Sequence, residues 1–178
     1  MRQVPGGDPF DRVLDQAQRR AFHLETRDDY LTASESQSLA AWLADESSDP
    51  GGDWFTPWTQ QVQRMTARGV AVQRARIVTE PHTDYTRYLL ALARHNIGAG
   101  EDVRYLPRAD ATPADSAAED MWLLDDATVV YSVFDDQDHW IGGVATDNAG
   151  LVQHAIAIRD RVWRAAIPYR DYVDRRAP

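Results

Sequence analysis

The change of residue pattern at Val70 constrains the fold more than any other feature of the sequence. Residues 70–78 (VAVQRARIV) are rich in β-branched residues and alternate in part, which predicts a strand that Glu80-Pro81 ends. A helical pattern over 84–95 follows, and a second strand over 101–106 comes next. A strand, a helix and a strand in this order predict a pair of parallel strands.

The second half of the chain predicts a meander covered by a helix. Strands are expected over 121–124 and 128–134, joined by a tight turn at Asp125-Asp126, with a last strand over 139–146. A long helix to about Ala166 follows. Together with the parallel pair, this pattern predicts an α+β fold, in which a mixed, partly parallel sheet of four to five strands is packed by helices.

The first third of the chain is predicted to be mainly helical. Helices are expected over 9–20, over 36–43 with Thr32 or Ser34 as the cap, and over 54–68. The stretch 22–30 between the first two is expected to be short and extended. We therefore predict a helical segment over 1–68 packed on an α/β core over 69–178, in one compact domain whose tail to Pro178 frays.

Missing residue types exclude several kinds of chemistry. The chain has no cysteine, which excludes disulfides, zinc–thiolate sites, iron–sulfur clusters and thiol nucleophiles. All 19 basic residues are arginine, so Schiff-base lysines and the P-loop lysine are excluded as well. The five histidines show no HxH or HExxH spacing, and no GxSxG elbow is present. No metal or cofactor is therefore expected.

The net charge of −9 bears on the partners that the chain can have. It argues against direct nucleic-acid binding, which needs positive surface, and it suits a basic partner such as a DNA-binding protein. No apolar run approaches the roughly 18 residues of a membrane span, and the polar start does not resemble a signal peptide. A cytoplasmic protein without membrane contact is expected, and the oligomeric state stays open.

The best candidate site lies in residues 74–88 (RARIVTEPHTDYTRY) and the strand that follows. Alternate strand residues share a face, so two arginines point the same way, toward a turn where parallel sheets bind ligands. The candidate ligand-binding residues are Arg74, Arg76, Glu80, Asp84, Tyr85, Arg87, Tyr88, Glu101 and Arg104. The competing interpretation is a structural junction, in which the arginines pair with Glu80 and with Glu101 or Asp102.

Three other polar segments are interpreted as structural. Residues 24–30 (LETRDDY) suit a turn held by a local ion pair better than a binding loop. The glycines of 96–104 follow a helix and precede a strand, the reverse of a phosphate loop, and indicate a helix end. The acidic pairs at 119–120 and 125–126, and the acidic run at 135–138, lack the spacing of a calcium loop and suit solvated turns.

Long stretches of the chain resemble one family. These are FHLETRDDY (22–30), RARIVTEPHTDYTRY (74–88), NIGAGEDVRYLPR (96–108), MWLLDD (121–126) and RDRVWRAAIP (159–168). They are similar to an actinobacterial domain of unknown function that is commonly encoded beside Xre-type helix-turn-helix regulators. The resemblance implies a protein that acts as an accessory to a transcriptional regulator.

A weaker resemblance is to one half of a phospholipase-D-like domain. In such a domain a strand, a helix and a strand precede an exposed loop and a strand that MWLLDD resembles, and active members carry an HxKxxxxD motif. If Asp126 takes the place of the motif's Asp, then Glu119 and Met121 stand where the motif has His and Lys. If Asp125 takes that place instead, Ala118 and Asp120 stand there. Neither alignment retains a nucleophile, so the resemblance implies a catalytically inactive version.

Two functional hypotheses follow. The first is a non-catalytic regulatory or sensing domain that acts with a helix-turn-helix regulator and binds a small anionic ligand near the arginines. The alternative is an enzyme of specialised metabolism acting on an anionic or phosphorylated substrate. In that case His82, Asp84, Glu101 or Glu25 would transfer protons and the arginines would hold the substrate. No residue is assigned a catalytic role.

Overall fold

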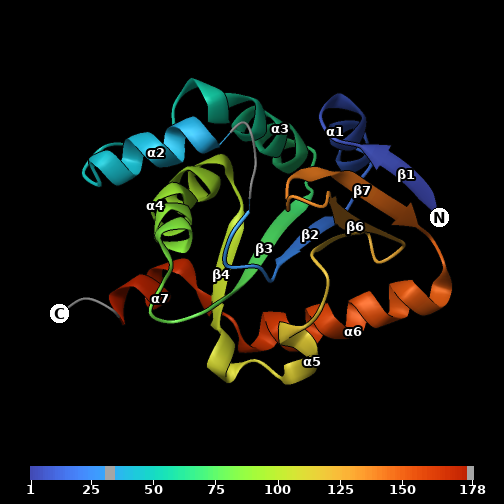
Figure 1. Ribbon diagram of the computed structural model, residues 1–178. Helices are drawn as coiled ribbons and strands as arrows, with labels where there is room; N and C mark the ends of the chain where they lie inside the picture. Colours follow the sequence, from blue (N-terminus) through green and yellow to red (C-terminus); the bar gives the residue numbers. More distant parts are fainter. Residues whose placement is uncertain (31–34, 176–178) are drawn as a thin grey trace.

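The structure, a computed structural model, describes residues 1–30 and 35–175 and contains one mixed sheet (Figure 1). Within that part of the chain the sheet has eight strands in the order β1-β7-β6-β5-β2-β3-β4-β8. The strands are β1 (Arg2–Pro5), β2 (Arg20–Glu25), β3 (Ala71–Val78), β4 (Asp102–Pro107), β5 (Met121–Leu124), β6 (Thr128–Phe134), β7 (Trp140–Thr146) and β8 (Ile167–Pro168). Strands β2, β3 and β4 are parallel and all other neighbours are antiparallel. The predicted α+β class with a partly parallel sheet is confirmed, with more strands than expected.

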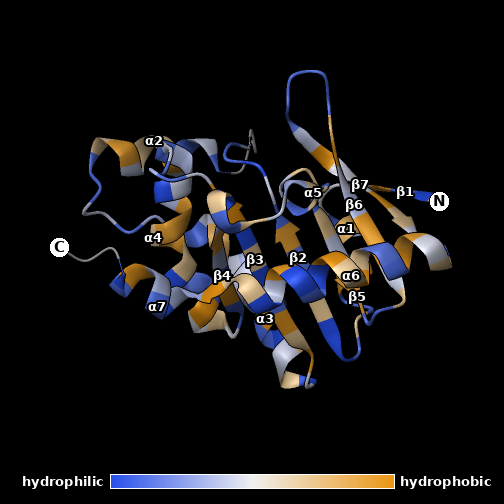
Figure 2. Ribbon diagram, turned by 90° about the horizontal axis from the view of Figure 1, so that it is seen from below, coloured by the Kyte–Doolittle hydropathy of each residue, from blue (hydrophilic) through white to orange (hydrophobic). Residues whose placement is uncertain are grey.

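Helices cover both faces of the sheet. They are α1 (Asp8–Leu14), α2 (Ser36–Ala44), the 3-10 helix η1 (Asp53–Phe55), α3 (Thr56–Ala67), α4 (Asp84–Ala99), the 3-10 helix η2 (Arg108–Asp110), α5 (Pro113–Ser116), α6 (Ala149–Ala165) and α7 (Tyr169–Asp174). Helices α1 to α4 lie on one face, and α6 runs across the other (Figures 1 and 2). None of the helices in the described residues is long and apolar enough to cross a membrane.

Strand alternation divides the core into two faces. The residues of the central strands that face α6 are apolar and buried: Phe22, Leu24, Ala75, Ile77, Met121 and Leu123. On the face toward α1 to α4, the first inward residues, Ala21 and Val72, are apolar as well. The following inward positions of β2 and β3 are instead polar or charged, and they form the floor of the site described below.

The first predicted helix is shorter than expected, because a distant carboxylate binds the backbone that follows it. Asp125 accepts hydrogen bonds from the backbone N–H groups of Gln18, Arg19 and Arg20, at 2.8, 2.7 and 2.8 Å. Helix α1 therefore ends at Leu14 and the chain enters β2 at Arg20. The extended stretch expected after the first helix is thus a central strand, and residues 1–68 contribute β1 and β2 to the same sheet as residues 69–178.

The C-terminal segment and two connections also differ from the expectation. The predicted frayed tail instead forms β8 and α7 up to Asp174, where Tyr172 stacks on Tyr105 with ring centroids 4.8 Å apart. The expected polar loop over 107–119 contains η2 and α5. Helix α4 continues to Ala99, and Gly100 ends it at a φ of 111°, which favours glycine. The predicted caps Thr32 and Ser34, and the last residues 176–178, lie outside the described chain.

Candidate functional site

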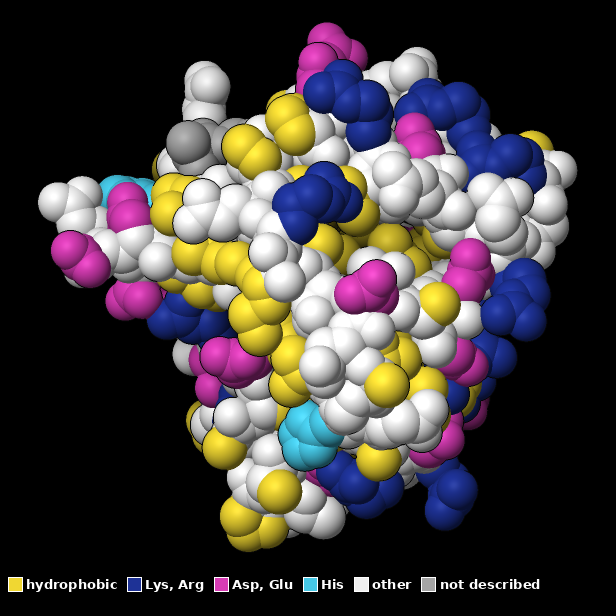
Figure 3. All heavy atoms as spheres, turned by 90° about the vertical axis from the view of Figure 1, so that its right-hand side faces the viewer, with side chains coloured by type: hydrophobic (Ala, Val, Ile, Leu, Met, Phe, Trp, Pro, Cys, Tyr) yellow, Lys and Arg dark blue, Asp and Glu magenta, His cyan; other side chains and the backbone are white. Residues whose placement is uncertain are grey.

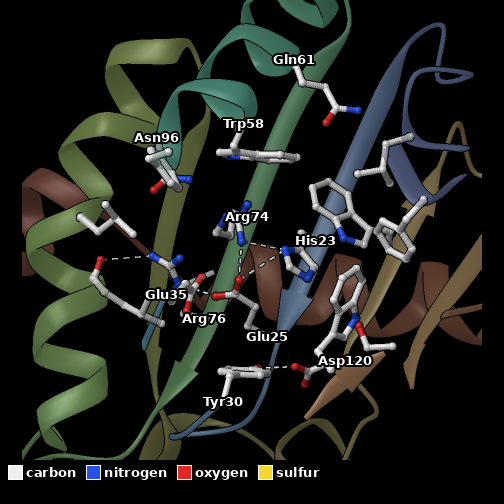
Figure 4. A pocket seen from close by; sticks show the side chains of 18 of the residues that line it. His23, Glu25, Tyr30, Glu35, Trp58, Gln61, Arg74, Arg76, Asn96 and Asp120 are labelled. Carbon is white, nitrogen blue, oxygen red and sulfur yellow. Dashed lines mark hydrogen bonds and ion pairs between the residues drawn. The ribbon is translucent and has the colours of Figure 1, made fainter. Parts of the chain in front are cut away.

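A cavity of about 350 Å³ lies between the sheet and helices α1, α3 and α4 (Figure 4). Its floor is formed by side chains of β2, β3, β5 and β6, and its other walls come from the helices and from η1. Nine aromatic side chains line it: Phe10, Tyr30, Trp54, Phe55, Trp58, Tyr85, Trp122, Phe134 and Trp140. The volume falls in the range of pockets that hold small molecules.

A buried network of charges forms the centre of the floor. The Glu25 carboxylate accepts hydrogen bonds from Arg74 Nη1 and from Arg76 Nε. On its other side, Arg74 donates through Nε and Nη2 to Glu101 Oε1, at 3.2 and 2.9 Å. Burial raises the pKa of Glu25, but the two guanidinium groups outweigh it and lower that pKa well below its usual range. The four charges of the network sum to zero.

His23 extends the network toward the aromatic wall. Its Nδ1 lies 2.8 Å from Arg74 Nη1, and a guanidinium nitrogen only donates, so Nδ1 accepts and the ring is neutral. The ring stacks on Trp122 with centroids 4.2 Å apart and planes at 11°. Burial and the charge of Arg74 both lower the pKa of His23 well below its usual value. His23 therefore contributes a neutral imidazole to the pocket.

This lowered pKa predicts a specific pH dependence of stability. Below about pH 6.5 the His23 side chain takes up a proton in the unfolded chain but not in the folded one. The free energy of unfolding therefore decreases as the pH is lowered, by up to about 1.4 kcal/mol per pH unit. His23→Gln keeps an acceptor for Arg74 but cannot take up this proton. When the pH is lowered from 7.5 to 5.5, we expect its free energy of unfolding, measured with urea, to decrease by about 1 kcal/mol less than that of the wild type. The exposed His154→Gln is the control. An identical decline in wild type and His23→Gln would contradict the assignment.

A second polar group, which we call the carboxylate–tyrosine cluster, comprises Tyr30, Glu35, Tyr85 and Asp120. Tyr85 donates its hydroxyl proton to Glu35 Oε2 at 2.6 Å, and Tyr30 donates to Asp120 Oδ2. The two tyrosine rings lie 5.7 Å apart, which connects the two hydrogen-bonded pairs. Burial raises the pKa of both carboxyl groups. Within the described chain, neither carboxylate has a basic side chain at ion-pair distance.

Two buried polar atoms of the pocket residues have no hydrogen-bond partner among the described groups. One is the Trp58 indole Nε1 on α3, and the other is Asn96 Oδ1 on α4. The amide nitrogen of Asn96 donates to Glu101, which fixes the orientation of that amide. Unpaired buried polar atoms are rare because each loses its hydration without compensation. Here one donor and one acceptor are left at a cavity.

The structure brings four of the nine predicted site residues together. Arg74, Arg76 and Tyr85 line the cavity, and Glu101 lies behind Arg74 as its ion-pair partner. Figure 4 shows both arginines pointing at Glu25 from the neighbouring strand β3. The pairing of Arg74 with Glu101 is also what the structural-junction interpretation expected, so the arginines serve both the sheet and the pocket.

The other five predicted residues lie elsewhere. Glu80 accepts a hydrogen bond from Tyr172 at 2.6 Å. Asp84 and Arg87 form an exposed ion pair at 2.8 Å, and Tyr88 is buried in an aromatic cluster between the helices. Arg104 lies on the opposite face of the sheet, 4.0 Å from the Trp163 ring. The turn after β3 therefore does not gather these side chains into one site.

The sequence reasoning missed most of the pocket. His23, Trp58, Trp122 and Asp120 were not proposed as ligand-binding residues, and Glu25 was considered only for the enzyme alternative. One signal was available: a strand with polar residues at alternate positions, as at 23 and 25, matches the pattern at 74 and 76. No short stretch of the sequence indicates that the aromatic residues line one pocket, because they come from many separate elements.

The acidic turns have structural partners. Asp125 binds three backbone amides, and Asp135 accepts from the N–H groups of Gln137 and His139 at 2.8 and 2.9 Å. In the part of the chain that the structure describes, no three histidine, aspartate or glutamate side chains are grouped as a metal ion would require.

Comparison with known proteins finds no match among curated proteins. A model of one protein family, described as a domain of unknown function (DUF6879), matches residues 8–174, which is almost the whole chain. The actinobacterial origin, the neighbouring regulator and the phospholipase-D-like likeness stay predictions. On the extent of the family match, the chain belongs to the DUF6879 family.

Proposed function

We propose that this chain is a ligand-binding domain that encloses a small organic molecule with a planar apolar part. The observation that carries the proposal is the cavity of about 350 Å³ lined by nine aromatic rings. Binding sites of this kind are mostly apolar and have a few polar groups that fix the orientation of the ligand. Trp58 Nε1 and Asn96 Oδ1 are such groups, since neither has a partner within the described protein.

The arrangement of the charged groups favours binding over catalysis. Glu25 is held by two arginines, and Arg74 is held by two carboxylates. His23 accepts a hydrogen bond from Arg74, so that nitrogen is not free to take a proton from a substrate. A general base needs a pKa near the working pH, and the directions found for Glu25 and His23 move both away from it. Burial raises the pKa of Glu35 and Asp120, but each of these carboxyl groups is already engaged by a tyrosine hydroxyl. We therefore propose a sensing rather than a catalytic role.

A screen of small aromatic fragments by saturation-transfer NMR tests the proposal. Fragments should bind the wild type, and Ser132→Phe, which places a ring in the cavity from β6, should abolish their binding. The matched control is Gln153→Phe on the exposed face of α6, which should bind as the wild type does. Fragment binding that is unchanged in a folded Ser132→Phe variant would place the ligand elsewhere and contradict the proposal.

We further propose that ligand binding is coupled to a helix-turn-helix regulator, as the sequence resemblance implies. The net charge of −9 supports a basic partner rather than DNA. On the face shown in Figure 3, arginines are interspersed with acidic side chains and form no continuous basic surface. Co-expression with the helix-turn-helix regulator that we expect to be encoded beside it, followed by size-exclusion chromatography, should give a complex. Separate elution of the two proteins, with and without a fragment found in the screen, would contradict the coupling.

A further inference from the structure

We infer that the ligand is an organic cation, a small ammonium compound whose charge lies at the carboxylate–tyrosine cluster and whose planar part lies among the tryptophans. This inference rests on the proposed ligand-binding function and names the chemical class of the ligand. It differs from the anionic ligand that the arginines alone suggested.

The charge balance of the pocket is the first argument. Arg74 and Arg76 are neutralised by Glu25 and Glu101, with the side chains of all four at most 11 % exposed. An anion would therefore compete with two carboxylates already in place. Three acidic residues that line the pocket remain after this pairing, the exposed Asp11 and the more buried Glu35 and Asp120, and none of them has a basic side chain at ion-pair distance in the described residues. The excess charge of the pocket is negative.

A further arginine near the cluster, Arg27, forms its ion pair with a carboxylate outside the cluster. Arg27 lies over the Phe134 ring at 4.2 Å and pairs with Asp138 at 2.7 Å. It thus approaches the cluster without forming an ion pair with Asp120. Hydrogen bonds from Tyr30 and from the Thr26 backbone and hydroxyl hold the Asp120 carboxylate in place, but none of these groups carries a charge. A buried carboxylate without a countercharge is costly, and a bound cation offsets that cost.

The aromatic walls are the second argument. The Tyr30 ring, whose hydroxyl donates to Asp120, has the rings of Tyr85 and Phe134 as neighbours at 5.7 and 5.9 Å. Ring faces attract ammonium groups, and cages of aromatic rings with an acidic side chain are a known way to hold them. The same pocket already holds one cation by this interaction, since Arg74 lies 5.5 Å from the Trp58 ring and 5.7 Å from the Trp122 ring.

The unpaired amide oxygen is the third argument and is independent of the carboxylates. Asn96 is 2 % exposed, its nitrogen is used by Glu101, and its Oδ1 has no partner in the described chain. An acceptor in this position requires a donor from the ligand. Trp58 Nε1 requires one acceptor in return, so the two groups together require one donor and one acceptor on the ligand, and an amine with one further polar atom supplies both.

Three indole compounds that differ only at the end of the side chain test the inference: tryptamine is a cation, tryptophol is neutral and indole-3-acetate is an anion. Their dissociation constants are measured by isothermal titration calorimetry at pH 7. We expect tryptamine to bind at least tenfold more tightly than tryptophol, and indole-3-acetate to bind more weakly than tryptophol. High salt should weaken tryptamine binding only modestly, because a buried pair is screened little.

Single substitutions test whether the carboxylate–tyrosine cluster causes the preference for tryptamine over tryptophol. Glu35→Gln keeps an acceptor for Tyr85 and should reduce the ratio between the tryptamine and tryptophol affinities several-fold, with the tryptophol affinity unchanged. Asp120→Asn should act in the same direction, and its melting temperature is measured first because Asp120 also accepts three hydrogen bonds. Glu46→Gln removes an exposed carboxylate that pairs with Arg87, and it is the matched control that should leave the ratio unchanged.

The outcomes separate this inference from the proposed function. Tighter binding of indole-3-acetate than of tryptamine, with both lost in Ser132→Phe, would confirm the pocket and overturn the cation. Equal binding of all three compounds, again lost in Ser132→Phe, would also confirm the pocket and overturn the preference for a cation. A preference for tryptamine that survives in both Glu35→Gln and Asp120→Asn would also overturn the assignment to the cluster. Failure of the fragment screen in the wild type would instead overturn the proposed function.

Discussion

Replacing Glu25 with glutamine is expected to lower the free energy of unfolding by about 3–5 kcal/mol, because it leaves two buried guanidinium groups without their shared carboxylate. The side chains of Arg74 and Arg76 are 8 % and 5 % exposed, so water cannot replace the lost charge. Urea unfolding at pH 7 measures the effect, and Asp84→Asn, in an exposed pair with Arg87, is the control that should barely move the midpoint.

A double variant distinguishes charge from packing. Arg76→Met removes one of the two cations that Glu25 serves, so Glu25→Gln with Arg76→Met should be clearly more stable than the sum of the two single effects predicts. The coupling is expected because the second substitution removes a charge that the first one stranded. Strictly additive losses would show that Glu25 acts through its shape and not through its charge, and would contradict this account of the network.

Replacing Trp122 with alanine is expected to cost a similar amount, about 3–5 kcal/mol, for a different reason. Trp122 is 4 % exposed and lies between the rings of His23 and Trp58, at centroid distances of 4.2 and 5.7 Å. Its removal leaves a void that joins the existing pocket. Trp163→Ala on α6 is the matched control; this ring is only partly buried and should cost less.

The void that Trp122→Ala creates can also be tested by the binding of indole. Indole fits the space that the Trp122 side chain vacates, and apolar cavities of this kind bind aromatic molecules. Indole at ten times its dissociation constant should return about 1.4 kcal/mol to Trp122→Ala and raise its melting temperature more than that of the wild type. Equal shifts in the wild type and the variant would show that the structure collapses around the missing ring.

Local patterns predicted much of the fold correctly. The parallel unit from Val70 to Leu106, the turn at Asp125-Asp126 and the long helix after Asn148 are all present. Each depends on neighbouring residues alone: β-branched alternation, a turn of two aspartates at positive φ, or a capping side chain before the helix, which in the structure is Asn148. Strand β2 was only expected as a short extended stretch, because its inward positions carry His23 and Glu25 and its pattern lacks the apolar run of a buried strand.

The candidate site could be predicted only in part, and the division follows the range of the interactions. Arg74 and Arg76 were found because two residues of one strand share a face. The role of Glu25 as their partner depends on the register in which β2 lies beside β3, where Glu25 is opposite Arg76. Nothing within either segment specifies that pairing, since strands far apart in the sequence are joined only by the sheet as a whole.

By itself, the sequence determined the α+β class, most helices and strands, and the absence of thiol and lysine chemistry, because propensity and composition act over a few residues. Only the tertiary structure decided that the arginines are neutralised and that Glu35 and Asp120 are not. It also decided that aromatic rings from separate elements enclose one cavity. Those properties arise from burial and from contacts between distant segments, which set the charge balance of a pocket and are not encoded in any local pattern.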